Sequence, residues 1–180
     1  LNVRNVYLGY FLEAFVVAGL TEETCKFLFL RTTWRSPAFD YQFDAIVYAV
    51  MVALGFAAFE NVKYVYSYGF ATGIVRAVTA VPGHAIFGVF MGYFYGYAKL
   101  SDYWGRDEDR GANLALSVVV PVLLHGCYDF LAFAQESDAR FTLLFYAYLI
   151  ALYVFGIRRV NRSARSDRRV TRETLFDYFR

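Results

Sequence analysis

The sequence predicts an all-α membrane protein, a polytopic bundle of about five transmembrane helices. Hydrophobic residues make up 58% of the 180 residues and aromatic residues 21%. Charged residues make up 19%, below the roughly 25% of an ordinary globular chain. Long apolar segments divide the chain, and none shows the alternating pattern of a membrane β-strand. This composition excludes a disordered chain, a coiled coil, a disulfide scaffold and a nucleic-acid-binding module.

The five apolar segments are residues 6–30, 43–67, 72–99, 112–135 and 140–157. A helix that crosses about 30 Å of hydrocarbon needs roughly 20 residues, so four segments are ample and the last just suffices. Polar connectors separate the segments. No internal repeat is visible, so residues 1–157 are predicted to form one transmembrane bundle. The chain begins at Leu1 and enters an apolar segment almost at once, so we expect additional sequence before it.

A basic tail, residues 158–180, is predicted to follow the bundle. Within residues 158–172 it carries one acid, Asp167, and seven arginines: Arg158, Arg159, Arg162, Arg165, Arg168, Arg169 and Arg172. The positive-inside rule makes this tail cytoplasmic, and counting back over five helices puts residue 1 outside. The tail is expected to contact anionic lipid rather than nucleic acid. The apolar residues 175–179 are predicted to lie on the membrane surface.

Several ionisable residues lie well inside these segments: Glu22, Glu23, Lys26, Glu60, His84, His125 and Asp129. Each charge near a helix centre costs roughly 2.5–3.5 kcal/mol, so these residues are functional candidates. Glu13, Lys63 and Arg76 lie nearer the ends of segments, where they can snorkel or fix helix packing.

Helical spacing groups some of these residues. Lys26 follows Glu22 by four residues and Glu23 by three, so its ammonium group can reach either carboxylate. Asp129 follows His125 by four residues, and an imidazole oriented by a carboxylate serves catalysis and metal ligation equally well. His84 heads a stripe of glycines spaced by four residues, which predicts that it faces a neighbouring helix.

Four short motifs occur in order, each in its own apolar segment. Residues 22–26 have the form EExxK, residues 55–61 GFxxxEN, residues 82–85 PGHA, and residues 125–129 HxxxD. Together they resemble the PrsW family of intramembrane proteases, which is grouped with the CAAX prenyl endopeptidases and the Abi proteins. The resemblance covers about residues 13–130.

The resemblance implies that Glu22, Glu23 and His84 or His125 form the catalytic centre. Glu60, Asn61 and Asp129 would complete the polar site. It further implies a prokaryotic plasma-membrane enzyme that acts on a membrane-spanning protein, with a single-span, anti-sigma-factor-like substrate.

Two versions of the chemistry stay open. In the first, Glu22 is the general base, assisted by Glu23 and supported by Lys26, with a water held towards His84. His125, oriented by Asp129, stabilises the oxyanion or protonates the leaving amine. In the second, a zinc ion is held by His84, His125 and either Glu23 or Glu60. No HExxH motif is present, so no local signature for zinc occurs.

The position of Glu60 and the class of function also have alternatives. In untilted helices Glu22 and Glu60 would differ in depth by about 12 Å, so Glu60 could belong to a second polar cluster. Buried acids and histidines also mark proton routes, so a proton- or cation-handling transporter is one alternative. A non-catalytic membrane scaffold is the other.

Overall fold

The computed structural model describes residues 3–171, and helices make up nearly all of that range. The first helical run consists of α1 (Val3–Phe11), the π-helix η1 (Leu12–Leu20) and α2 (Thr21–Arg31). A 3₁₀ turn, η2 (Thr32–Arg35), leads to α3 (Asp44–Tyr68). Then follow α4 (Phe70–Val78), α5 (Ala80–Tyr103), α6 (Asp107–Ala134) and α7 (Arg140–Arg165). Residues 3–171 are therefore all-α and form five helical segments, with α4 and α5 counted as one.

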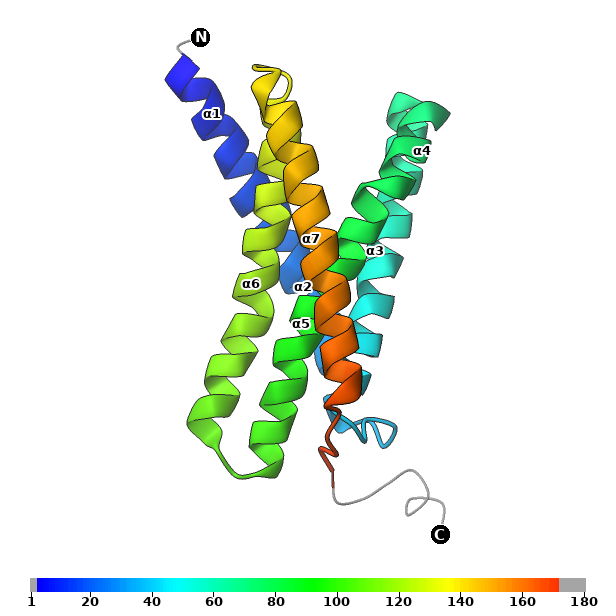
Figure 1. The fold of residues 1–180 in the computed structure, drawn as a ribbon, viewed down its shortest axis with the longest axis vertical. Coiled ribbons are helices and arrows are strands. Elements are labelled where there is room, and N and C mark those ends of the chain that lie inside the picture. Colours follow the sequence, from blue (N-terminus) through cyan, green and yellow to red (C-terminus); the bar gives the residue numbers. More distant parts are fainter. Residues whose placement is uncertain (1–2, 172–180) are drawn as a thin grey trace.

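Four of these segments are long and apolar enough to cross a membrane: α3, α4 with α5, α6 and α7. The first segment is divided into three elements of 9, 9 and 11 residues, each shorter than the roughly 20 residues a span needs. The three elements still run on from one another as one rod (Figure 1). Many large apolar side chains on these helices face outward, as expected in lipid. The chain is an integral membrane protein.

The helix limits differ from the sequence prediction at three places. The third predicted segment is two helices, α4 and α5, which meet at Thr79. Helix α6 begins at Asp107 rather than at 112, because the acids in its first turn suit the positive end of the helix dipole. Helix α7 continues beyond 157 to Arg165, since arginine is a good helix former.

The described part of the basic tail packs against the connector between α2 and α3. The amide of Gln42 donates to the carbonyl of Arg168 at 2.8 Å, and that of Val170 donates to Asp40 at 2.8 Å. Val170 is buried among core residues. Residues 166–171 are thus part of the folded body, whereas the residues predicted to lie on the membrane surface, 175–179, are outside the described range.

Helix α5 is the centre of the bundle and packs against α3, α4, α6 and α7. Its glycine stripe makes the close approach to α3 possible. A Cβ at Gly88 would lie 2.9 Å from the carbonyl oxygen of Ala49, and one at Gly92 would lie 2.5 Å from that of Ala45. Only glycine leaves room for the α3 backbone at these points, so the stripe has the packing role that its spacing predicts.

Candidate active site

The ionisable residues of four helices converge in the middle of the bundle. Helix α2 contributes two adjacent glutamates and a lysine immediately after the π-helical stretch, a type of distortion often found near functional sites. Helices α5 and α6 each contribute one histidine, and α3 contributes a glutamate. Of the group, Glu23, Lys26, His84 and His125 are buried, with at most 3% of each residue exposed.

An unbroken series of polar contacts joins these residues across the bundle. It begins with Glu60 Oε2, which lies 3.0 Å from His84 Nε2. His84 Nδ1 lies 2.9 Å from Lys26 Nζ, and that ammonium donates to Glu23 Oε1 at 2.6 Å. The same carboxylate oxygen lies 2.8 Å from His125 Nδ1. Each buried polar group thereby gains a partner, which offsets part of the cost of placing it in an apolar medium.

The two histidines are held in matching ways. His84 Nε2 faces the carboxylate of Glu60, and His125 Nε2 faces that of Asp129 at 3.3 Å. In both rings Nδ1 is therefore the atom turned towards the α2 residues, Lys26 in one case and Glu23 in the other. The ring of Phe87 also stacks on the His125 imidazole, with centroids 5.1 Å apart. Carboxylates and packing together fix the orientation of both rings.

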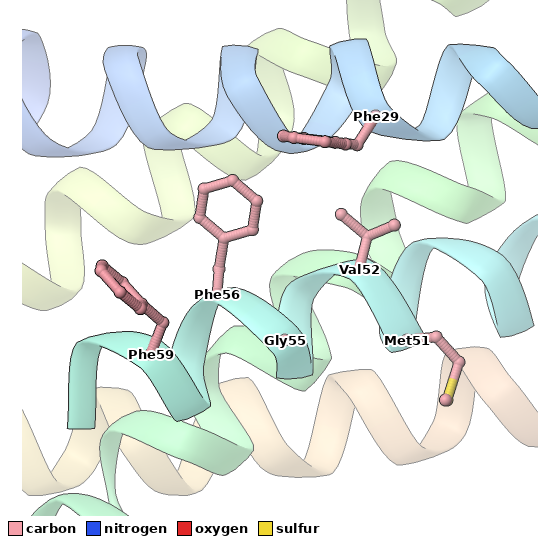
Figure 2. Close-up of a pocket in the computed structure, with 6 residues that line it drawn as sticks. All are labelled: Phe29, Met51, Val52, Gly55, Phe56 and Phe59. Carbon is pink, nitrogen blue, oxygen red and sulfur yellow. The ribbon is translucent and has the colours of Figure 1, made fainter. Parts of the chain in front are cut away.

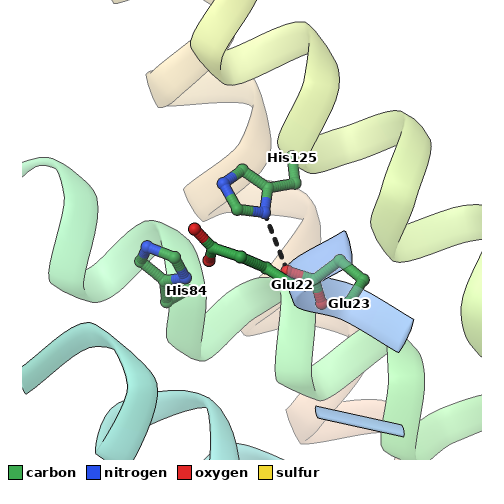
Figure 3. A group of neighbouring side chains, drawn as sticks. All are labelled: Glu22, Glu23, His84 and His125. Atoms are coloured by element: carbon green, nitrogen blue, oxygen red, sulfur yellow. Dashed lines mark hydrogen bonds and ion pairs between the residues drawn. The ribbon is translucent and has the colours of Figure 1, made fainter. Parts of the chain in front are cut away.

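The two glutamates of α2 have different surroundings. Glu23 is wholly buried between Lys26 and His125. Glu22 lies 3.4 Å from Lys26, and 27% of its side chain is exposed. Its carboxylate extends towards the space between the two imidazoles (Figure 3). Glu23 is thus bound into the network, whereas Glu22 remains accessible to a water or a substrate.

Glu60 lies against the rest of the site rather than in a separate cluster, since it contacts His84 directly. The depth difference expected for untilted helices does not prevent this contact. Glu60 also pairs with Arg76 of α4, whose guanidinium nitrogen lies 2.9 Å from Oε2 and whose carbon lies 3.7 Å from the centroid of the Tyr64 ring.

The sequence prediction assigned Arg76 to helix packing and missed this pairing. One signal was available: no acid lies within four residues of Arg76, so a buried partner had to come from another helix. Asn61, predicted to support the site, donates instead to the carbonyl of Gly73 at 3.4 Å and so joins α3 to α4.

The site also has the donor atoms that a divalent metal requires. Four residues, Glu22, Glu23, His84 and His125, each offer one ligand atom, and these atoms lie within 4.8 Å of one another. Two imidazoles with carboxylates suit zinc. Glu23 Oε2 is buried and has no hydrogen-bond partner, so it has free capacity for a ligand bond. The donor set therefore fits a metal ion, although Lys26 would have to withdraw from a nitrogen of His84 that served as a ligand.

Comparison with known proteins identifies the family. The model of the family described as PrsW family intramembrane metalloprotease matches residues 3–157. Protease PrsW of Bacillus subtilis (strain 168) is 37% identical over 164 residues, covering 91% of this chain and 72% of that protein. Protease PrsW of Oceanobacillus iheyensis is 36% identical over 158 residues, covering 87% and 70%, and that of Clostridioides difficile is 33% identical over 174 residues, covering 92% and 71%.

No solved structure matches the chain. The family model and the bacterial relatives agree on an enzyme, which decides against the transporter and scaffold alternatives. A protease requires a protein substrate, and the buried glutamates and histidines lie within a bundle of membrane helices. The chain belongs to the PrsW family of intramembrane metalloproteases.

Proposed function

We propose that this protease hydrolyses a peptide bond in a substrate with a single membrane span, of the anti-sigma-factor type, at the site formed by Glu22, Glu23, His84 and His125. The observation that carries the proposal is the convergence of these four side chains inside an otherwise apolar bundle. Acids and imidazoles at that depth cost free energy, and such residues in membrane spans typically mark functional sites.

Glu22 is the general base in this mechanism. It is the more accessible of the two α2 glutamates, and its carboxylate extends towards the imidazoles. It takes a proton from the attacking water as the new C–O bond forms at the peptide carbonyl. When the C–N bond breaks, the leaving amine needs a proton in return, and the carboxyl group of Glu22 holds one.

Glu23, Lys26 and the histidines have supporting roles. Lys26 keeps the buried Glu23 paired, and Glu23 in turn holds His125 at 2.8 Å. In the version without a metal, His125, oriented by Asp129, stabilises the oxyanion or protonates the amine in place of Glu22. His84, held by Glu60, turns Nδ1 towards the same space and positions the water.

In the version with a metal, we propose zinc, with His84, His125 and Glu23 as its ligands, and His125 is then a ligand rather than a proton donor. Glu23 is favoured over Glu60, because Glu60 contacts the outer nitrogen of His84 and does not belong to the group of four close donors. When bound, the ion supplies Lewis acidity that polarises the scissile carbonyl.

Co-expression with a panel of single-span fusion proteins, each carrying a reporter on both sides of the membrane, tests the function. Cleavage within the span is expected for at least one fusion, with loss of cleavage in Glu22→Gln and Glu23→Gln. Glu13→Gln is the matched control, because Glu13 is an exposed glutamate of the same helical run. Cleavage that persists at the wild-type rate in both glutamine variants at equal protein level would overturn the assignment.

We also propose that the protein resides in the bacterial plasma membrane with its basic C-terminal tail on the cytoplasmic side. The arginines in the last turns of α7 and after it support this orientation. A reporter that is active only in the cytoplasm, fused after residue 180, should be active, and an inactive one would reverse the orientation.

A further inference from the structure

A groove of about 490 Å³ lies between α2 and α3 on the outside of the bundle (Figure 2). Its lining is apolar and consists of Phe29, Met51, Val52, Gly55, Phe56 and Phe59. Phe29, Met51 and Phe59 are 60%, 66% and 77% exposed, so the groove faces the surroundings of the bundle rather than its core. In a membrane those surroundings are lipid, so a hydrophobic segment within the bilayer has direct access to it.

The groove leads to the active site along both of its walls. On α3, the ring of Phe56 lies 5.6 Å from the Nζ of Lys26, and Glu60 follows Phe56 by one turn. On α2, Phe29 follows Glu22 by seven residues, which places the two side chains on nearly the same face of the helix. The rings of Phe29 and Phe56 meet edge to face at 5.9 Å. The groove therefore ends about one turn from Glu60 on α3 and about two turns from Glu22 on α2.

Gly55 lines this groove at a point where no other described residue packs against it. A Cβ at Gly55 would meet nothing within 4 Å, whereas one at Gly88 or Gly92 of the packing stripe would meet the backbone of α3. A glycine inside a helix costs about 0.8–1.0 kcal/mol relative to alanine. Contacts within the described residues do not explain why this position is a glycine, because none of those residues occupies the space next to its Cα.

We propose that this groove seats the membrane-spanning segment of the substrate, and that Gly55 is the position over which the two helices cross. A glycine at a helix crossing lets two backbones approach closely in a membrane, and the open space at Gly55 is suited to that contact. The alignment of the groove with Glu60 and Glu22 argues for the substrate as the occupant, because a helix seated in the groove and continuing along α2 by about two turns reaches Glu22. This inference rests on the proposed function, and it assigns Gly55 and the surrounding rings as determinants of which spans are cut.

The first test compares leucine at two glycines that have equal space. Gly55→Leu fills the groove, and Gly9→Leu places the same side chain on α1, where a Cβ also meets nothing within 4 Å. With a cleaved fusion as substrate, Gly55→Leu should raise KM about tenfold or more, equal to about 1.4 kcal/mol, with kcat changed little. Gly55→Ala should give a smaller rise and Gly9→Leu none. The melting temperature of Gly55→Leu should be no lower than the wild-type value, because leucine favours a helix more than glycine does. Unchanged KM in Gly55→Leu would overturn the inference.

The second test does not depend on cleavage. A photoreactive p-benzoylphenylalanine is placed at position 59 in the groove or, as a control, at position 143, where Leu143 is 77% exposed on α7. The probe is a biotinylated peptide of about 24 leucine and alanine residues with flanking lysines, long enough to span the bilayer. Crosslinking at 59 should exceed that at 143 and fall in Gly55→Leu. Equal crosslinking at the two positions, or crosslinks to lipid alone, would overturn the inference.

The two tests separate failure of the groove from failure of the proposed function. If fusions are cleaved normally by Gly55→Leu, the protease assignment stands and the groove is not the substrate path. If no single-span fusion is cleaved but the peptide still crosslinks selectively at 59, the groove binds a helix and the proposed substrate class is wrong. A change in oligomeric state of Gly55→Leu, measured by size-exclusion chromatography with light scattering, would assign the groove to a second copy of the chain instead.

Discussion

Lys26 and Glu23 form an ion pair of 2.6 Å in which the lysine side chain is 1% exposed and the glutamate side chain is not exposed at all. The Lys26 ammonium also lies 2.9 Å from His84 Nδ1, so one cation joins the residues of α2 to those of α5. A buried pair of this kind costs much more to break than its formation contributes, because the remaining charge has no solvent.

Removal of the lysine should therefore destabilise the bundle strongly. Lys26→Met leaves Glu23 without its cation, and we expect a loss of about 3–5 kcal/mol in the free energy of unfolding. Titration with SDS, followed by circular dichroism, measures this loss. Lys63→Met is the control, since Lys63 is an exposed lysine of α3 that pairs with no described acid. Equal effects of the two substitutions would contradict a structural role for the pair.

The contact between Arg76 and Glu60 should appear as a coupling in a double-mutant cycle. Their side chains are 16% and 22% exposed, and the two atoms lie 2.9 Å apart. We expect Arg76→Met and Glu60→Gln together to destabilise the protein less than the sum of the single changes, by about 1 kcal/mol or more. Unfolding in SDS gives the four free energies. Strict additivity would mean that the pair is open in the membrane.

Asp129 should affect catalysis through His125. Asp129→Asn keeps the shape of the side chain but removes the charge that faces His125 Nε2 at 3.3 Å. Loss of a carboxylate that orients an active-site histidine lowers activity by about 10–100-fold, and we expect a fall of that size in kcat. Cleavage of a single-span fusion measures it, with Asp138→Asn in the α6–α7 connector as control. A wild-type kcat in Asp129→Asn would show that His125 needs no orienting partner.

Metal content provides a test that does not depend on activity. The purified protein is expected to hold about one zinc ion per chain, and Glu23→Gln, His84→Ala and His125→Ala should lose it. Folded Lys26→Met protein should keep the metal, because the Lys26 ammonium contacts donor atoms of Glu23 and His84 but is not itself a ligand. Elemental analysis by mass spectrometry after mild chelation measures the content. Full cleavage activity in wild-type protein that holds no metal would overturn the zinc version and support the version in which Glu22 acts without a metal.

Because α5 packs closely on α3, even a methyl group added at Gly92 is expected to destabilise the protein. A methyl group there would lie 2.5 Å from both the carbonyl oxygen of Ala45 and the Cα of Ile46, and neither backbone atom can move freely. We expect Gly92→Ala to lower the free energy of unfolding by about 1–3 kcal/mol. Gly111→Ala in α6, where a Cβ meets nothing within 4 Å, should leave the stability unchanged or raise it, because alanine favours a helix. The SDS titration would contradict this packing if Gly92→Ala were as stable as the wild type.

The sequence by itself determined the class of protein and the local part of the site. Apolar segments about as long as the bilayer is thick predict spans, because length and composition suffice for that. The pairs Glu23 with Lys26 and His125 with Asp129 also follow from the sequence, since helix geometry brings residues three or four apart together. The sequence did not predict the start of α6, because its first residues are polar and lie outside the apolar segment. It did not predict the break between α4 and α5 either, because the hydropathy stays high across it.

Only the tertiary structure decided how the helices combine these local pairs into one site. The contacts of Glu60 with His84 and Arg76, and of Lys26 with His84, join residues on different helices. Their distances depend on the tilt and the relative depth of whole helices, which a sequence pattern does not specify. The same is true of the groove beside Gly55, since a space between two helices exists only once side-chain packing has set how far apart they lie.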